Sequence, residues 1–340
     1  MAVMRAVLLK EPGDLRVESV ADPSPEPDEI LLRVRNCGIC GSDLHAAKYG
    51  LQMPPDAILG HEFAGEIVAL GARVDDWNVG ERVVSLPYMA CGECPACRRG
   101  DGILCPALRG IGLGQLPGAF AEYVRVHPGS LLRVPPEIDF RTAAMVEPLA
   151  VGLHGLRHSG LGPERNCLIL GAGPVGLVSL LWARDLGVRD VVVSELAAGR
   201  RAMAERLGGI AVDPTSGDPA TVVRERSGRE PEVILECIGA RGMLNNAMML
   251  AGIRGRITVL GVCVEPDEIL PLTGILKELE VKFALGYSKQ EFADALEALR
   301  SGRIDVAPLV TDVIDLEQVP ETFHALATPT TQCKVLIEFP

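Results

Sequence analysis

The sequence has no excess of positive charge. Its 340 residues contain 33 Lys and Arg against 45 Asp and Glu, which gives a formal net charge of −12 at pH 7. Nucleic acids and anionic membranes attract basic surfaces, so bulk electrostatics argues against both as partners. An acidic balance is common among enzymes and by itself indicates no particular substrate.

Long hydrophobic runs and targeting segments are also missing. The longest stretch without charge, residues 166–183, has about the length of a membrane span but is interrupted by three glycines and a proline. The first residues lack the basic end, apolar run and cleavage site of a signal peptide. We therefore expect a soluble cytoplasmic protein. In that compartment its ten cysteines would be metal ligands or buried packing residues rather than disulfides.

The pattern of apolar residues changes near residue 165. Before it, short β-type runs such as 30–36 and 63–70 are separated by Gly and Pro, which predicts an all-β unit. After it, apolar strands alternate with helical segments, which predicts a parallel sheet with helices on both faces. The tail from about residue 288 begins with Ser288-x-x-Glu291, a capping box that predicts a helix, and two further strands follow.

Four of the ten cysteines lie close together in the sequence: Cys91, Cys94, Cys97 and Cys105. Two-residue gaps let neighbouring thiolates turn onto one tetrahedral ion, and four thiolates form a closed zinc site. Because a closed site has no vacancy for a substrate, we predict a structural zinc. The segment also resembles a zinc ribbon. However, Arg98 and Arg99 are the only basic residues that flank it, and it has no aromatic platform, which argues against a nucleic-acid-binding module.

A glycine-rich run, Gly171-Ala-Gly173-Pro174-Val175-Gly176, follows an apolar strand and opens a helix. The glycines permit a tight turn and let the backbone approach a pyrophosphate at the helix N-terminus. The next strand ends in Glu195, nineteen residues after Gly176, and its carboxylate can accept hydrogen bonds from ribose hydroxyls while repelling a 2′-phosphate. The pattern predicts NAD rather than NADP as the cofactor, although Arg200 and Arg201 follow closely.

A second set of metal-ligating residue types is spread along the chain: Cys40, His61, Glu62 and Glu147. Thiolate, imidazole and carboxylate groups all bind zinc, and a catalytic zinc needs three protein ligands and one vacant position. The spacing is loose, and His61 alone could equally be a buried core histidine and Glu62 a surface carboxylate. Residue types therefore favour an open zinc site without deciding its ligands.

Together these motifs resemble those of the zinc-dependent medium-chain alcohol and polyol dehydrogenases. The resemblance covers essentially the whole chain in the family's order, and within the family it is strongest to the butanediol, sorbitol and threonine dehydrogenase branch. It is carried by Gly60-His61-Glu62-x2-Gly65-x5-Gly71-x2-Val74, the four-cysteine segment, Val146-Glu147-Pro148-Leu149-Ala150 and the glycine-rich run.

The resemblance implies an α/β protein with two domains. A GroES-like, β-rich catalytic domain would comprise residues 1–152 and 288–340, and a Rossmann domain with a doubly wound parallel sheet would comprise residues 153–287. The Rossmann domain would bind NAD through the glycine-rich run, Glu195 and Arg200. Most relatives have aspartate where this chain has Glu195, and the longer side chain reaches the same hydroxyls.

The resemblance also implies two zinc ions per chain. Cys40 and His61 would bind the catalytic zinc, with Glu62 or Glu147 as the third ligand, and the four-cysteine segment would bind the structural zinc. Ser42 and His45 match the family's proton relay.

The implied activity is hydride transfer between a secondary alcohol, with a vicinal diol or polyol favoured, and NAD in a homodimer or homotetramer. A threonine-type or cyclic-alcohol dehydrogenase is a second possibility within the family. A zinc-free reductase of the same superfold is a third, against which Cys40, His61 and Glu147 argue. The fourth is an NAD-binding regulatory protein without catalysis.

Overall fold

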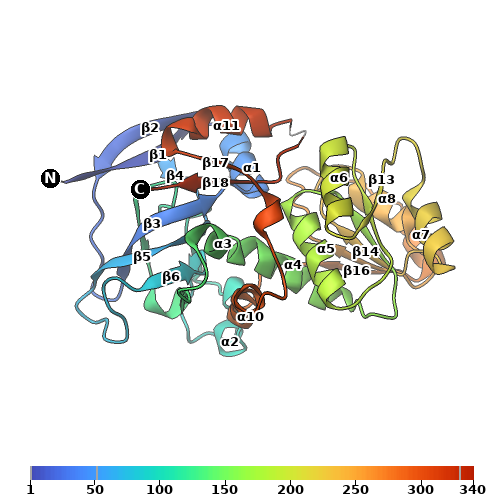
Figure 1. Cartoon of the computed structure of the whole chain (residues 1–340), viewed down its shortest axis with the longest axis horizontal. Coiled ribbons are helices and arrows are strands. Elements are labelled where there is room, and N and C mark those ends of the chain that lie inside the picture. The colour runs from blue at the N-terminus through green and yellow to red at the C-terminus, as the bar shows by residue number, and fades with distance from the viewer. Residues whose placement is uncertain (1, 51–52, 329–330) are drawn as a thin grey trace. The chain divides into compact units, whose positions relative to one another are not determined.

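The computed structural model describes residues 2–50, 53–328 and 331–340, and the chain folds into two compact units. The first unit comprises Met1–Glu147, Ser288–Gly302 and Val310–Pro340, and the second comprises Pro148–Tyr287 and Arg303–Leu309. Figure 1 labels helices and strands of both units where there is room and colours the chain by residue number. The architecture expected from the sequence, a β-rich unit and a parallel-sheet α/β unit, is confirmed.

Two short segments expected in the first unit belong to the second, namely residues 148–152 and 303–309. The reason is their packing on helix α5 (Pro174–Asp185). The indole Nε1 of Trp182 donates to the carbonyl of Leu149 over 2.8 Å. Arg303 forms an ion pair of 2.7 Å with Asp185 and lies over the Trp182 ring.

The strands of the first unit pair antiparallel, except that β17 and β18 are parallel. Its largest sheet has the order β10-β6-β5-β3-β18-β17, with β9 also paired to β3, and a smaller sheet has the order β2-β1-β4. A two-stranded ribbon, β7-β8, leads into and out of the four-cysteine segment. The strands are β1 (Val3–Glu11), β2 (Asp14–Ala21), β3 (Ile30–Gly38), β4 (Ala57–Ile58), β5 (Glu62–Leu70), β6 (Arg82–Ser85), β7 (Tyr88–Met89), β8 (Arg109–Gly110), β9 (Tyr123–Val126), β10 (Leu131–Arg133), β17 (Val310–Ile314) and β18 (Lys334–Glu338).

Buried and exposed side chains alternate along part of β3, and the buried ones of β3 and β5 contribute to the core of this unit. In β3, Leu32 and Val34 are fully buried while Arg33 between them is exposed, as the two-residue period of a strand requires. Phe63 and Phe120 fill the same core. The helices of this unit are α1 (Gly41–Tyr49), α2 (Pro95–Arg98), α3 (Phe140–Ala144), α10 (Lys289–Arg300) and α11 (Val319–Leu326), while α4 (Val146–Ser159) begins here and continues into the second unit.

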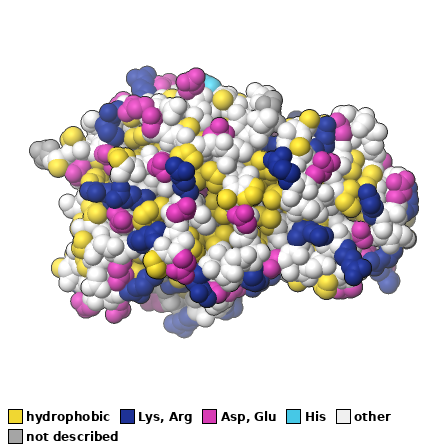
Figure 2. All heavy atoms as spheres, viewed as in Figure 1, with side chains coloured by type: hydrophobic (Ala, Val, Ile, Leu, Met, Phe, Trp, Pro, Cys, Tyr) yellow, Lys and Arg dark blue, Asp and Glu magenta, His cyan; other side chains and the backbone are white. Residues whose placement is uncertain are grey.

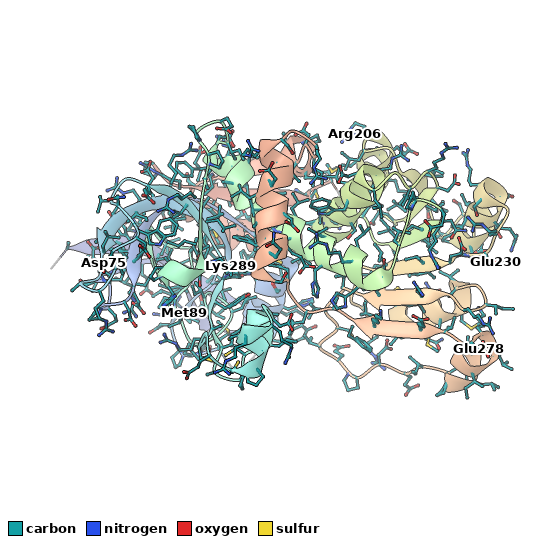
Figure 3. All side chains as sticks on the ribbon, turned by 90° about the horizontal axis from the view of Figure 1, so that it is seen from below. Asp75, Met89, Arg206, Glu230, Glu278 and Lys289 are labelled. Atoms are coloured by element: carbon teal, nitrogen blue, oxygen red, sulfur yellow. The ribbon has the colours of Figure 1, made fainter. Side chains whose placement is uncertain are left out.

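The predicted capping box at the start of α10 is present. Ser288 Oγ accepts from the Glu291 N–H, and the Ser288 N–H donates to Glu291 Oε2 over 2.8 Å. Lys289, labelled at the start of this helix in Figure 3, donates to the Gly129 carbonyl over 2.6 Å. The contact ties the late-sequence helix to the N-terminal part of the unit.

The second unit is a six-stranded sheet with the order β13-β12-β11-β14-β15-β16, and every neighbouring pair is parallel. Relative to the chain this is the 3-2-1-4-5-6 order of doubly wound dinucleotide-binding folds. Its strands are β11 (Cys167–Leu170), β12 (Val191–Ser194), β13 (Ile210–Val212), β14 (Val233–Glu236), β15 (Arg256–Val259) and β16 (Glu280–Phe283). Its helices include α5, α6 (Ala198–Arg206), α7 (Pro219–Ser227), α8 (Met243–Leu250) and α9 (Pro271–Lys277).

In the described ranges, every helix is too short or too polar to cross a lipid bilayer. On the face drawn in Figure 2, basic and acidic side chains are interspersed.

Candidate metal and cofactor sites

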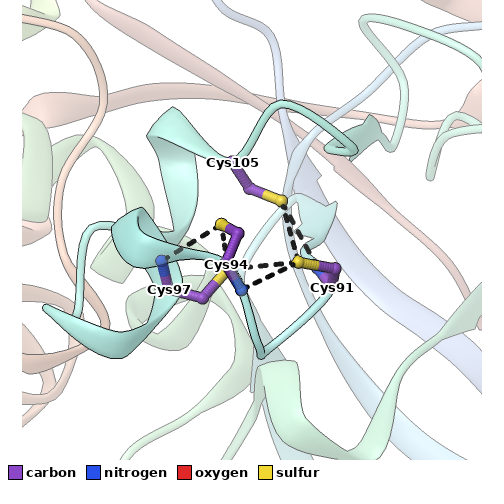
Figure 4. Close-up of side chains that lie close together, drawn as sticks. All are labelled: Cys91, Cys94, Cys97 and Cys105. Atoms are coloured by element: carbon purple, nitrogen blue, oxygen red, sulfur yellow. Dashed lines mark hydrogen bonds between the residues drawn. The ribbon is translucent and has the colours of Figure 1, made fainter.

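The four cysteines predicted to bind a structural zinc form one cluster (Figure 4). Cys94 Sγ lies 3.5 Å from Cys97 Sγ, Cys105 Sγ lies 3.5 Å from Cys91 Sγ, and Cys91 and Cys97 are 3.9 Å apart. Zn–S bonds in a tetrahedral site imply S···S separations of about 3.8 Å. The cluster therefore fits a zinc ion with little rearrangement.

The backbone of this segment is arranged to support thiolates. The N–H groups of Cys94 and Cys97 donate to the sulfur three residues earlier, over 3.4 and 3.5 Å. Backbone N–H groups of Glu93 and Cys94 lower the pKa of Cys91 to about 7, whereas burial and the neighbouring sulfurs raise the pKa of Cys97 to about 12. Four adjacent thiolates repel one another unless a cation compensates them, which is what a structural zinc provides.

The second cluster comprises Cys40, His61 and Glu62, whose ligand atoms lie within 4.8 Å of one another. Cys40 is the N-cap of α1, and Glu62 begins β5 with His61 immediately before it. His61 and Glu62 are buried while Cys40 is half-buried. Three mixed sulfur, nitrogen and oxygen donors match a zinc site that keeps one open position.

Glu147 lies at the start of α4 and is buried. Among the described residues, its carboxylate is not part of the group formed by Cys40, His61 and Glu62. The structure therefore brings together three of the four candidate ligands, and a direct role of Glu147 stays a prediction.

Asp43, which connects these ligands, was not predicted from the sequence. Its fully buried carboxylate accepts the Cys40 N–H over 2.9 Å, the Gly60 N–H over 3.3 Å and lies 3.2 Å from His61 Nδ1. A proton held between Nδ1 and Asp43 leaves the Nε2 lone pair of His61 for a metal ion. Burial alone would lower the pKa of His61, but the negative charges of Asp43 and Cys40 raise it well above its usual value.

The predicted relay residues Ser42 and His45 both lie on α1. Ser42 Oγ is 3.3 Å from His61 Nε2, the ring nitrogen that Asp43 does not contact. His45 is three residues further on, so it shares a face of the helix with Ser42. Its Nδ1 is buried and has no hydrogen-bond partner among the described residues. Burial, assisted by the charge of Lys48, lowers the pKa of His45 below its usual value.

Lys334, a fully buried lysine at the start of β18, was not predicted either. Its Nζ donates to Glu62 Oε2 over 2.6 Å, to Glu62 Oε1 over 2.8 Å and to the Ile39 carbonyl over 3.1 Å. In the sequence it looks like an ordinary polar residue at a strand end. Only the pairing of β18 with β3 reveals its place beside the cluster.

The glycine-rich run connects β11 to α5 as predicted. Gly171 has a φ of +95°, and a Cβ on Gly176 would lie 1.9 Å from the Gly171 carbonyl oxygen, so both positions require glycine. Gly173 is the N-cap of α5 and Pro174 occupies its first turn. The N-terminus of α5 thus lies at the carboxyl end of the central strand, where a pyrophosphate binds in this fold.

Glu195 lies beside this turn. Its Oε2 accepts the Ala172 N–H and its Oε1 accepts the Ala197 N–H, each over 2.8 Å. Arg201 pairs with Asp213 at 3.0 Å and donates to the Glu195 carbonyl. A guanidinium nitrogen of Arg200 is 4.0 Å from the position of a Cβ on Gly173, so Arg200 is the arginine that lies near the glycine-rich run.

Comparisons with known proteins agree with this architecture. Residues 26–136 match the family model of the alcohol dehydrogenase GroES-like domain, and residues 174–301 match that of the zinc-binding dehydrogenases. The chain is 32% identical to (R,R)-butanediol dehydrogenase of Bacillus subtilis, covering 98% of this chain and 99% of that protein. It is 30% identical to human sorbitol dehydrogenase, covering 94% of this chain and 91% of that protein.

A solved structure of a zinc-binding dehydrogenase from Sinorhizobium meliloti bound to NADP is also similar. It has a TM-score of 0.89 and 33% identity, and the match covers all of both chains. Fold, motif order and full-length relatives confirm the resemblance noted in the sequence. The chain therefore belongs to the zinc-dependent medium-chain alcohol and polyol dehydrogenases, a family of oxidoreductases that use a nicotinamide cofactor.

Proposed function

We propose that this enzyme transfers a hydride between NAD and the carbinol carbon of a vicinal diol or polyol, with zinc bound by Cys40, His61 and Glu62. The observation that carries the proposal is the grouping of these three donor atoms within 4.8 Å. The substrate class is supported by the full-length similarity to enzymes named for butanediol and sorbitol.

The residues around the cluster fit a zinc ion. When bound there, zinc would supply a Lewis acid that stabilises negative charge developing on the alcohol oxygen. Asp43 fixes the tautomer and orientation of His61, and Lys334 fixes the carboxylate of Glu62. The chain thus orients two of the three donors through buried hydrogen bonds.

The alcohol proton needs an acceptor during oxidation. The Ser42 hydroxyl lies next to the metal-facing nitrogen of His61 and can receive a hydrogen bond from an alcohol there. Burial lowers the pKa of His45 and so favours its neutral form, and its Nδ1, which has no hydrogen-bond partner among the described residues, can take up a proton. The two side chains support a proton route along one face of α1.

Glu195 supports NAD as the cofactor. Two backbone N–H groups hold its carboxylate beside the glycine-rich run, where its charge disfavours a 2′-phosphate. Arg201 is engaged with Asp213, which leaves Arg200 as the arginine near the run. A similar solved structure is bound to NADP, so the preference for NAD over NADP has to be measured.

We also propose a second, structural zinc in the four-cysteine cluster, because its sulfur–sulfur distances match a tetrahedral site.

All ten cysteines have free thiols in the structure, which favours a reducing compartment such as the cytoplasm.

A second copy of the chain is the partner that β16 supports. This strand is at the edge of the sheet. The N–H groups of Glu280, at its start, and of Ala284, just after its end, donate to the carbonyls of residues 255 and 259. The N–H groups of Val281 and Phe283 therefore point away from β15. If β16 paired antiparallel with β16 of a second copy, centred on Val281, Glu280 would lie opposite Lys282 of the second copy. Exposed apolar side chains lie on β16, on the residues after it and on α9: Leu272, Ile275, Leu276, Val281, Phe283 and Leu285. An open edge of this kind is suited to pairing across a twofold axis.

The proposed function is tested by a substrate screen. Vicinal diols, sugar alcohols, threonine and cyclic alcohols are mixed with NAD and, separately, NADP, and the absorbance of the reduced cofactor is followed. Highest kcat/KM for a diol or polyol with NAD supports the proposal. A highest value for threonine or cyclic alcohols would contradict the substrate class, and turnover after removal of all zinc would contradict the metal site.

We predict that His45→Ala lowers kcat on the order of tenfold, because the proton must then leave by another route. The neutral form of His45 is the acceptor, so the wild-type rate should decline as the pH falls through its lowered pKa. The variant should lose this acid limb, and added imidazole should restore part of the rate. An unchanged pH profile of kcat would remove His45 from the proton route.

We predict that Glu195→Ala lowers the ratio of kcat/KM for NAD over NADP by about tenfold or more, because it removes both the acceptor for ribose hydroxyls and the charge that repels a 2′-phosphate. Glu205→Gln is the control, since it removes an exposed charge from α6. Steady-state kinetics with both cofactors give the ratio. A preference that stays the same in both variants would show that another group sets it.

For the structural site, we predict that Cys94→Ser reduces the zinc content from two ions to one per chain and lowers the thermal unfolding midpoint, because metal binding there contributes to folding. The control is Cys263→Ser, which changes an exposed cysteine outside the cluster. Elemental analysis and calorimetry measure both effects. Two ions per chain in Cys94→Ser would contradict the assignment.

For the oligomer, we predict that Val281→Pro converts a dimer into a monomer, since proline removes an outward-facing N–H that an edge strand does not use internally. Val281→Thr keeps this N–H and should stay dimeric. Light scattering after gel filtration gives the mass, and circular dichroism checks the fold. A folded Val281→Pro protein of unchanged mass would rule out pairing through β16.

A further inference from the structure

Lys334 is the only lysine or arginine that is buried within the described part of the chain. All three of its N–H groups are used, two on the carboxylate oxygens of Glu62 and one on the Ile39 carbonyl. A buried ammonium is costly unless it is paired, so its position is set by the carboxylate that it contacts.

The carboxylate of Glu62 occupies a slot that the backbone leaves open for it. Gly38 in β3 pairs with Glu62 in β5, and a Cβ on Gly38 would lie 2.1 Å from Glu62 Oε2. Leu336 of β18 pairs with Gly38 from the other side, and the Ile39 N–H donates to the Val335 carbonyl over 2.9 Å. Three strands therefore fix the carboxylate between a glycine and an ammonium.

The charges around this slot are unbalanced without Lys334. Cys40, Asp43 and Glu62 place three potential anions close to His61, and the two carboxylates among them are buried. Lys334 places a fixed positive charge in direct contact with one of these carboxylates, that of Glu62. A metal ion bound by Glu62 would share its carboxylate with this ammonium.

Resting on the zinc site of the proposed function, we propose that Lys334 is a positioning residue that holds Glu62 for the ion and limits how much of its negative charge the ion receives. The ammonium draws charge from the carboxylate and repels a cation, so binding of the ion is weaker than the three donors alone would make it. In return, less of the ion's charge is neutralised by Glu62, and more acts on the substrate oxygen.

The direction in which zinc affinity changes when Lys334 is replaced separates this role from a structural one. A residue needed only for folding would, when replaced, loosen the site and release the ion more easily. A residue that competes with the ion for Glu62 would, when its charge is removed, let the ion bind more tightly while the reaction slows.

The test compares four variants of the full-length zinc-loaded protein with the wild type: Lys334→Met, Lys334→Gln, Lys334→Arg and Lys289→Met. Lys334→Gln keeps a hydrogen-bond donor without the charge and decides the outcome if Lys334→Met does not fold. Lys289→Met is the matched control, because it removes an exposed lysine of the same unit. Dipicolinate is titrated against each protein, and the zinc that remains is measured by elemental analysis.

We expect the Met and Gln variants to need about tenfold more dipicolinate to lose the ion at Cys40, while their zinc-saturated kcat falls on the order of tenfold. Lys334→Arg and Lys289→Met should behave like the wild type. With cobalt in place of zinc, the visible absorption bands should shift in the Met and Gln variants only. Equal or easier loss of zinc from both of these variants would overturn the inference, whereas a wild type that holds no ion at Cys40 would overturn the proposed function itself.

Discussion

The candidate catalytic site depends on the hydrogen bonds of the Asp43 carboxylate. This carboxylate accepts the backbone N–H of Cys40 at the start of α1 and that of Gly60 before β5, and it contacts the ring of His61. These segments are separated in the chain, so a single buried anion sets the distance between the thiol and the imidazole. The same contact engages Nδ1 of His61 and leaves Nε2 as the nitrogen available to the proposed zinc ion.

The two candidate metal sites differ in how their geometry is built. The four-cysteine cluster is local: its ligands come from one short segment, and backbone N–H groups of that segment support the sulfurs. The cluster at Cys40 is assembled from β3, α1, β5 and the distant β18. A closed site can therefore form with its own loop, whereas the open site needs the whole sheet.

This difference explains what the sequence could predict. The cysteine cluster, the glycine-rich turn, the capping box at Ser288 and the parallel sheet depend on local spacing, and their positions were predictable. Helix α1 was not predicted because it is short and its buried residues, Asp43, Ala46 and Ala47, include only two small apolar ones. Asp43 and Lys334 were missed because their roles arise from strand pairing, and the unit boundary shifted because α5 recruits residues 148–152 and 303–309.

The position of β18 has a consequence for the order in which the protein matures. This strand contains residues 334–338, far from β3 in the sequence, yet it lies inside the largest sheet, between β3 and β17. During synthesis the earlier segments emerge first and can begin to fold, but the partner of Glu62 emerges 272 residues after it. The four-cysteine cluster can therefore form as soon as its own segment has emerged, whereas the candidate site at Cys40 is completed only when β18 joins the sheet.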